Sequence, residues 1–308
     1  MKTPKKTKIK KVDKVTVLTT IYTVVDDAMK ASACLNITRP GVDPKLTDAE
    51  VVTIAIYQEM IGEPREDHFF RLHSETLKQY FPNLNERSRY NRRKRDLWLV
   101  ILSVRVCLEP VLKALLAKEG ILDSAPVPCV GYKRSKNQTR FHDADYGVCS
   151  SKAMQYFGYK FHAIVSLTGT IIDFMLTSAR PYDNQPVIEF ITAMKTSLKK
   201  IFGDKAYNDA LLQQYLKQHH GISLLAPTKD NQKDRLPKKV IKGLNTIRLL
   251  IETVNAQLQE QFHLSKHYAK SQWGLFTRIA AKITAHTIGT VVNKLCGRPP
   301  LAMASLAV

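Results

Sequence analysis

The sequence predicts two domains of different class, an all-α domain followed by an α/β domain with a mixed sheet. The chain has 308 residues, more than one compact core usually holds, and its 44% hydrophobic content is enough for two cores. Apolar residues recur at spacings of three and four before Pro110, whereas alternation with a period of two begins after Gly120. This change of period places the domain boundary near residues 110–120.

The helical part follows a basic arm, residues 1–14, which holds seven lysines. The arm could track phosphates or could simply be a solvated tail. Apolar spacing predicts a first helix over residues 15–35. Thr47 and Glu50 form a capping-box pattern that predicts a second helix ending at Ile61. A third helix is expected over residues 67–80, and we assign residues 15–118 to the helical domain.

The most basic segment, residues 86–95, contains six cations and leads directly into apolar residues from Leu97. We expect one helix with exposed basic first turns and buried later turns. Cations near a helix N-terminus oppose the macrodipole, so phosphate contact explains them better than structure does, although a solvated basic face is the alternative. A series of helices whose last helix is basic suits a DNA-binding domain of the helix-turn-helix type. The expected DNA-contacting residues are Arg87, Arg89, Arg92, Arg93 and Arg95.

The α/β domain is expected over residues 119–296, with a short tail over residues 297–308. Three meandering strands followed by alternating helices and strands, the order βββαβαβα, predict a sheet that begins antiparallel and continues parallel. We expect the helix over residues 271–295 to seal this sheet. The other predicted elements are strands 121–130, 158–167 and 170–177, helix 184–198, strand 200–202, helix 208–219, strand 222–226, a basic loop 229–242 and helix 244–261.

Three carboxylates fall on separate predicted elements, namely Asp123 on the first strand, Asp204 just past the fourth and Glu252 on the long helix. Each alone could be a solvated acid. If the first and fourth strands are neighbours, however, the aspartates can meet, and a helix laid across can bring Glu252 to them. Such carboxylates repel one another unless divalent cations neutralise them, and oxygen ligands favour Mg²⁺ or Mn²⁺ over zinc. Two ions ~4 Å apart can catalyse phosphodiester transfer.

The formal net charge of +20 favours a polyanionic partner, with nucleic acid the first candidate and an anionic membrane surface the second. No apolar run approaches the roughly 18 residues of a spanning helix, and the basic N-terminus has no apolar segment after it. This disfavours both membrane insertion and secretion. The five cysteines are scattered and never spaced C-x-x-C, so we expect a reduced, cytoplasmic protein.

Other polar residues suggest sites less strongly. His142, Asp143 and Asp145 form an H-D-A-D cluster, but we expect it in a solvated loop between strands. His219 and His220 precede Gly221 and are expected to close a helix, where a histidine suits the C-terminus. Lys205 and Tyr207 flank Asp204 and could contact DNA, or each could be structural.

Four motifs together resemble one known family. They are D-S-A-P-V-P from Asp123, G-Y-K-F-H-A-I-V-S-L-T-G-T-I-I-D-F from Gly158, G-D-K-A-Y from Gly203 and R-L-L-I-E-T-V-N-A-Q-L from Arg248. This combination resembles the catalytic core of the DDE transposases of bacterial insertion sequences, members of the RNase H-like, retroviral-integrase superfamily. The resemblance covers about residues 121–295, and the stretches L-T-D-A-E-V-V-T and L-N-E-R-S-R-Y-N-R-R-K-R extend it more loosely to the N-terminal part.

The resemblance implies an RNase H-like fold and a metal-binding catalytic triad of Asp123, Asp204 and Glu252, separated by 81 and 48 residues. It also implies that Arg248 contacts DNA, with Lys205 beside the second aspartate. Many relatives carry different residues at three positions, with Tyr at the position of Asn245, Lys at Gln259 and Gly at Ala206.

The function that the resemblance implies is transposition with Mg²⁺, or Mn²⁺, as the cofactor. Such a protein binds double-stranded DNA at the ends of an insertion sequence, cleaves it and joins the 3′-hydroxyl ends to target DNA, as a homo-oligomer in the cytoplasm at the nucleoid. One alternative is a metal-dependent nuclease without strand transfer. The other is an inactive, transposase-derived DNA-binding protein, which fits the charge equally but gives no reason for three acids at these places.

Overall fold

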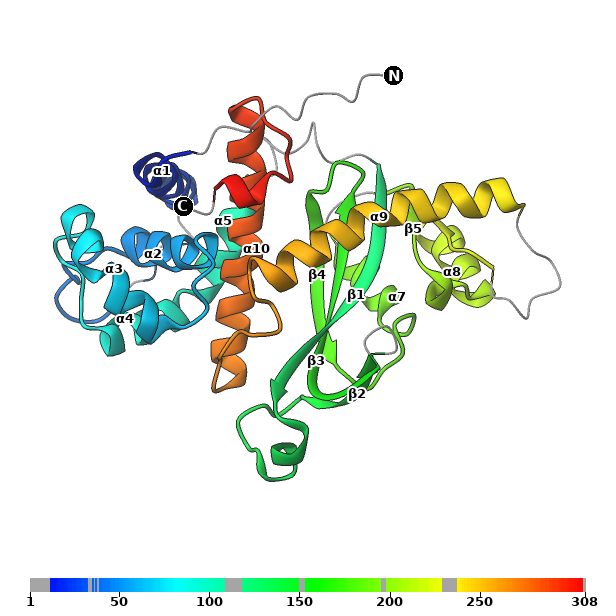
Figure 1. The fold of residues 1–308 in the computed structure, drawn as a ribbon, viewed down its shortest axis with the longest axis horizontal. Coiled ribbons are helices and arrows are strands. Elements are labelled where there is room, and N and C mark those ends of the chain that lie inside the picture. Colours follow the sequence, from blue (N-terminus) through cyan, green and yellow to red (C-terminus); the bar gives the residue numbers. More distant parts are fainter. Residues whose placement is uncertain are drawn as a thin grey trace, which may run out of the picture. The chain divides into compact units, whose positions relative to one another are not determined.

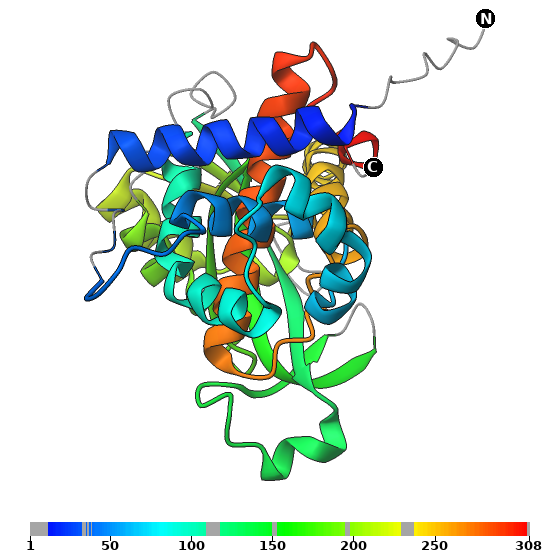
Figure 2. The same cartoon turned by 90° about the vertical axis from the view of Figure 1, so that its left-hand side faces the viewer.

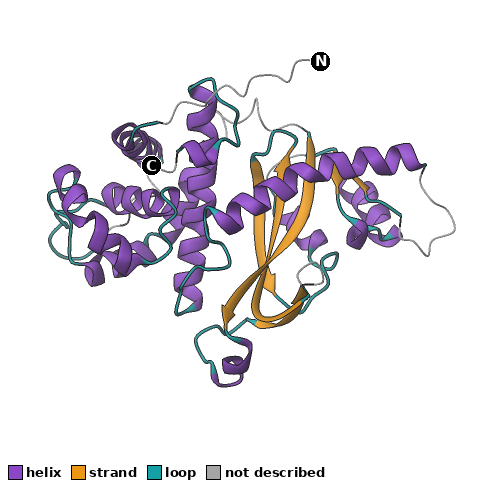
Figure 3. Ribbon diagram, viewed as in Figure 1, coloured by secondary structure: helices purple, strands orange, loops and turns teal. Residues whose placement is uncertain are grey.

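The computed structural model describes residues 12–32, 35, 37, 39–108, 118–149, 153–194, 198–228 and 237–306. The chain divides into two compact units, one formed by Met1–Glu109 with Phe276–Val308 and the other by Pro110–Leu275. Figure 1 labels the elements, and Figure 3 shows that the strands of the described residues all belong to the second unit. An all-α unit and an α/β unit are therefore present. Much of the predicted basic arm (residues 1–11) and of the basic loop (229–236) lies outside the described residues.

The helical unit begins with α1 (Lys14–Ala31), which packs against α2 and α5 (Figure 2). The predicted capping box is confirmed at the start of α2, where the Glu50 N–H donates to Thr47 Oγ1 at 3.2 Å and the Thr47 N–H donates to Glu50 Oε2 at 2.6 Å. The following helices are α2 (Asp48–Met60), α3 (Glu66–Tyr80), α4 (Arg87–Asp96) and α5 (Trp98–Cys107), with a short 3₁₀ turn, η5 (Met303–Ser305), near the C-terminus.

The basic segment does not form the single helix that we predicted. The helix breaks at Leu97, which is fully buried and has φ −91° and ψ 12°, so α4 ends and α5 begins on either side of it. Arg93, Lys94 and Arg95 consequently lie in the last turn of α4, where the helix dipole stabilises cations. The dipole argument for phosphate contact is therefore wrong for these three residues.

The long helix α10 (Gln272–Leu295) was predicted to seal the sheet, and this is wrong from Phe276 onward, because that part belongs to the helical unit. Arg278 and Lys282 both bind Glu59 of α2, and the Thr284 hydroxyl donates to the Ile101 carbonyl oxygen at 2.9 Å. Every residue of 277–293 is buried. An apolar pattern of this kind shows that a helix is buried but not which partner buries it, so the division falls at Phe276 and not at residue 296.

The α/β unit is built on one mixed sheet. β1 pairs antiparallel with β3 and parallel with β5, β6 extends the parallel side, and β2 and β4 pair in succession with the other edge of β3. The predicted antiparallel start, parallel continuation and adjacency of the first and fourth predicted strands are confirmed. β2 was not predicted. The strands are β1 (Glu119–Val130), β2 (Asp145–Cys149), β3 (Met154–Ser166), β4 (Ile171–Ser178), β5 (Lys200–Phe202) and β6 (Ser223–Leu225).

Helices cover this sheet and connect its strands. Apolar residues of α7 (Val187–Ala193) and α8 (Ala210–His220) share one core cluster with β1, β3, β4, β5 and β6. α9 (Lys238–Glu260) packs on β1 and β5, as Figure 1 shows. α8 ends at His220, and Gly221 closes it in the left-handed conformation at φ 67°, so the predicted role of the two histidines is confirmed. Two 3₁₀ turns are η2 (Tyr132–Asn137) and η4 (Lys205–Tyr207).

Within the described part of the chain, no helix has the length and apolar character needed to cross a membrane.

Candidate functional site

The sheet brings Asp123 and Asp204 to corresponding positions. Ile121 of β1 and Phe202 of β5 form the last parallel pair, and each aspartate follows its strand residue by two positions. Because adjacent parallel strands rise in step, Asp123, within β1, and Asp204, just past β5, lie at the same level along the two strands. The negative charge of Asp204 acts on Asp123, where it raises the pKa. The structure therefore brings together two of the three predicted ligands.

A tight turn presents Asp204. The Asp204 side chain caps η4, since its Oδ1 accepts a hydrogen bond from the Ala206 N–H at 2.9 Å. Tyr207 is fully buried beneath this turn, and a Cβ at Gly203 would lie 2.8 Å from the Tyr207 ring. Glycine is therefore needed at position 203, and Tyr207 is structural. Lys205 is exposed on the same turn.

Asp123 lies in a site that disfavours its charge. Burial is the largest cause that raises its pKa, to about 7, and the negative charges of Asp204 and Asp183 raise it further. The Ser124 N–H, which donates to Asp123 Oδ1 at 2.8 Å, and the cation of Arg248 oppose this rise. A divalent cation beside the carboxyl would favour its ionised form in the same way.

Glu252 does not join the two aspartates in this arrangement. Its side chain is 49% exposed on α9 and forms an ion pair with Arg248, with 3.1 Å between Oε1 and Nη2. Among the residues that the structure describes, no group of three or more His, Cys, Asp or Glu side chains is placed to hold a metal ion. Asn255 of α9 contacts the site directly, since its Nδ2 donates to Asp123 Oδ2 at 2.9 Å.

Asn255 and Asp183 were missed by the sequence reasoning. Asn255 follows Glu252 by three positions, and this spacing on one helix face was a usable signal. Asp183 lies within electrostatic reach of Asp123 and forms an ion pair with Lys160 at 2.7 Å. The signal there was Lys160 itself, because a lysine in an otherwise buried strand needs a polar or charged partner.

The basic residues of α4 divide into two groups. Arg87, Arg89 and Arg92 are exposed. Arg93 instead forms an ion pair with Asp48 at the start of α2, and Arg95 is half-buried. Among the described residues, Arg87, Arg89 and Arg92 form no ion pair that phosphate contact would have to break, whereas Arg93 has a structural role.

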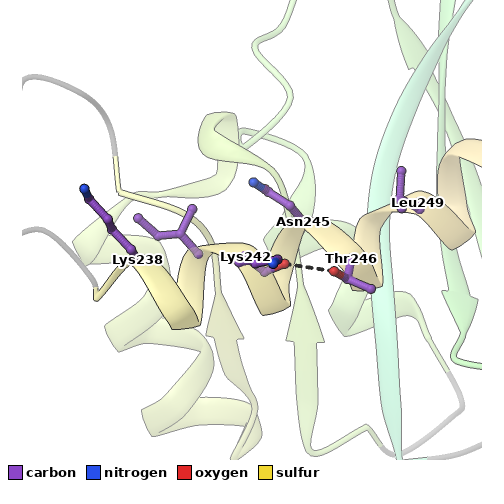
Figure 4. A pocket seen from close by; sticks show the side chains of 6 residues that line it. Lys238, Lys242, Asn245, Thr246 and Leu249 are labelled. Carbon is purple, nitrogen blue, oxygen red and sulfur yellow. Dashed lines mark hydrogen bonds between the residues drawn. The ribbon is translucent and has the colours of Figure 1, made fainter.

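The first half of α9 presents a face that carries two lysines among polar and apolar residues. Lys238, Lys242, Asn245, Thr246 and Leu249 line a shallow hollow, at spacings of three and four that place them on one side of the helix (Figure 4). The Thr246 hydroxyl donates to the Lys242 carbonyl oxygen at 3.0 Å. Glu252 continues the same spacing, so this face leads along the helix to the third predicted carboxylate.

Within the described structure, the side chains of the H-D-A-D cluster do not form a group of three that could hold a metal ion. His142 and Asp143 are exposed in a turn, as predicted. Asp145 instead begins β2 and lies 3.7 Å from Arg180 in an ion pair.

The comparisons with known proteins bear on this geometry. A family model described as "Transposase DDE domain" matches residues 114–272, just over half of the chain. The matched range contains Asp123, Asp204 and Glu252. Comparison with curated proteins and with solved structures gave no match.

Proposed function

Because the chain belongs to the transposase DDE-domain family, we propose that it binds the ends of an insertion sequence, cleaves the DNA there and joins the freed 3′-hydroxyl ends to target DNA. The mixed α/β sheet with flanking helices fits an RNase H-like DDE domain. The observation that carries the proposal is that Asp123 and Asp204 each lie two residues beyond the last parallel pair of the adjacent strands β1 and β5, with α9 bonded to Asp123 through Asn255.

The proposed cofactor is Mg²⁺ or Mn²⁺. Asp123 and Asp204 offer the hard oxygen ligands that these ions prefer. Burial and carboxylate repulsion raise the pKa of Asp123, and a bound cation would lower it again. Bound there, divalent ions would activate a water or a 3′-hydroxyl and stabilise the leaving oxygen of the phosphodiester. The donor chemistry of the two aspartates therefore fits the cofactor.

Arg248 and Glu252 act as a pair in this proposal. The ion pair between them is partly exposed, with the Glu252 side chain 49% exposed, so solvent screens it and it can open at little cost. When Glu252 turns toward the aspartates to become the third ligand, the Arg248 guanidinium is released to bind a DNA phosphate. The two roles that the family resemblance implies are thus linked through one contact.

We propose DNA contacts on each of the two units separately. Arg87, Arg89 and Arg92 are exposed on α4 of the helical unit, which we propose binds the element ends. Lys205 is exposed beside Asp204, and the α9 face carries further lysines. We propose that the protein acts as a homo-oligomer on double-stranded DNA.

The test uses full-length protein, Mg²⁺ and a plasmid that carries the DNA flanking the gene. Asp123→Asn, Asp204→Asn and Glu252→Gln should each abolish cleavage while DNA binding remains. Glu189→Gln, which removes an exposed acid of α7 in the same unit, is the matched control and should cleave normally. A triad variant with wild-type cleavage would remove that residue from the site. Cleavage without joined product would identify a hydrolytic nuclease, and binding without either reaction an inactive DNA-binding protein.

A further inference from the structure

We propose that the segment between β1 and β2, residues 131–144 (the β1–β2 excursion), together with Tyr146 of β2, binds single-stranded DNA by stacking an unpaired base on exposed tyrosines. The inference rests on the proposed function, because that function makes DNA the substrate. It adds a second contact on the same unit, away from the carboxylates. In Figure 1 the excursion is the green loop with one short helical turn that follows β1.

The charge of the excursion favours a polyanion. Residues 131–140 contain Lys133, Arg134, Lys136 and Arg140, all exposed, and no acidic residue. The one acid of the excursion is Asp143, which accepts a hydrogen bond from Gln272 Nε2 at 2.6 Å. Four cations against one acid leave the excursion with a net positive charge, and phosphate is its chemical complement.

Two aromatic rings lie among these cations. Tyr132 is 48% exposed and Tyr146 of β2 is 40% exposed, with 5.3 Å between their ring centroids. Together with Lys133 and Lys136 they line a hollow of about 590 Å³. A surface that contacted only the phosphate backbone of duplex DNA would need the cations but not the exposed rings. Exposed rings beside cations are instead the pattern by which proteins hold unpaired bases, because a base stacks on the ring while its phosphate meets a cation.

Hydrogen bonds hold these rings in place. The buried Ser135 hydroxyl donates to the Tyr132 carbonyl oxygen at 2.6 Å and accepts from the Tyr146 hydroxyl at 2.7 Å. Tyr146 also packs edge-on against Phe157 at 5.1 Å. Buried Phe141 anchors the far end of the excursion. Ordering such a surface on binding has little entropic cost, because it is already ordered.

The position along β1 defines the role of this surface. Val130, at the end of β1, follows Asp123 by seven positions, which corresponds to about 23 Å at the usual rise of a strand. A stacked DNA strand covers that length with about seven nucleotides. The excursion therefore holds a strand at a distance from the reacting phosphate and takes no part in the chemistry.

The test measures binding of full-length protein to a labelled 20-nucleotide single strand and to the duplex of the same sequence. All proteins also carry Asp123→Asn, so that no substrate is cleaved. Tyr132→Ala should weaken single-strand binding about tenfold and change duplex binding less than twofold, whereas Tyr132→Phe, which keeps the ring, should bind as the parent does. Tyr215→Ala, which removes a half-exposed ring of α8, is the matched control and should not weaken binding.

A second variant tests the cations. Lys133→Gln with Lys136→Gln should reduce the slope of log affinity against log salt for the single strand by about 0.7 per lysine. Unchanged single-strand affinity in Tyr132→Ala, with an unchanged salt slope in the lysine variant, would overturn the inference. A changed oligomeric state with unchanged DNA affinity would also overturn it and assign the surface to contact between copies.

The two proposals fail in different ways. If the wild-type protein cleaves element ends but Tyr132→Ala binds single strands normally, the excursion proposal fails and the transposase proposal stands. If no cleavage occurs but Tyr132→Ala loses single-strand affinity, the transposase proposal fails and the excursion proposal stands. Thermal unfolding of each variant confirms that it is folded, which we expect because Tyr132, Lys133 and Lys136 are all exposed.

Discussion

Both units bury carboxylates, but the pKa of the buried carboxylate is lowered in the helical unit and raised in the α/β unit. In the helical unit Glu59 is 4% exposed and is bound by Arg278, at 2.7 Å, and by Lys282. Burial acts to raise the pKa of Glu59, yet the charges of Arg278 and Lys282 more than offset it, so the pKa is lowered. Glu66 of α3 is paired in the same way with Lys94 of α4.

In the α/β unit Asp123 accepts its two hydrogen bonds from uncharged donors, the Ser124 N–H and the Asn255 amide. Its pKa is raised, and a second carboxylate lies nearby. The difference teaches how to separate structural acids from functional ones. A buried acid with cations in contact belongs to the fold, whereas a buried acid held by neutral donors beside another acid is poised to receive a cation.

The largest expected effect is the loss of a structural acid. Glu59→Gln leaves Arg278 and Lys282 without their carboxylate, and removing one partner of a buried pair typically lowers the free energy of unfolding by about 3–5 kcal/mol. Urea denaturation of the full chain measures this. Asp26→Asn, which breaks an exposed pair with Lys30 on α1, is the control and should leave the urea midpoint essentially unchanged. Equal urea midpoints for the two variants would contradict the assignment of Glu59 as a structural acid.

The second expected effect is a gain in stability on removing the charge of Asp123, opposite in sign to the effect of Glu59→Gln. The pKa of Asp123 is about 7 in the folded chain and near 3.8 in an unfolded one, so the folded state binds more protons between these pH values. The wild-type protein therefore loses stability as the pH rises from about 4 to about 7, by at most about 4 kcal/mol from this group. Asp123→Asn removes that loss. Without divalent cations, the variant should be more stable than the wild type at pH 8.

The pH dependence supplies the control for this prediction. At pH 4 the carboxyl is protonated in the folded chain, so the stabilities of Asp123→Asn and the wild type should nearly coincide. Added Mg²⁺ should stabilise the wild type at pH 8 and not the variant, because only the wild type keeps the ligand. A variant less stable than the wild type at pH 8 in the absence of metal would mean that Asp123 is a structural acid like Glu59.

Local signals in the sequence predicted most elements to within a few residues. The Thr47–Glu50 capping box placed the start of α2, and the short apolar run at Lys200–Phe202 placed β5. Two errors came from tertiary packing. Nothing in the local pattern distinguishes a continuous helix from one that breaks at buried Leu97, and the apolar residues of α10 do not say which unit buries them.

The candidate site was predictable only in part, for a related reason. Asp123 lies on β1 and Asp204 follows the adjacent strand β5, and the order of strands and helices was enough to infer that adjacency. Which residue of α9 faces Asp123 depends on the rotation of that helix on the sheet. The spacing places Glu252 and Asn255 on one helix face, but a sequence motif does not contain that rotation, so it could not show that Asn255 contacts Asp123 while Glu252 pairs with Arg248.

The smallest expected effect concerns Asn255, and it sharpens the comparison at the site itself. Its amide orients Asp123 from α9 without adding charge. Removing an outer partner of a metal ligand commonly lowers metal affinity or activity by about 10- to 100-fold, so Asn255→Ala should need more Mg²⁺ for half-maximal cleavage but should still cleave at saturation. Thr253→Ala, whose hydroxyl bonds only to the Leu249 carbonyl of its own helix among the described residues, is the control. An Mg²⁺ requirement that is the same in both variants would show that Asp123 keeps its orientation without Asn255, and the contact would then be a feature of the metal-free protein alone.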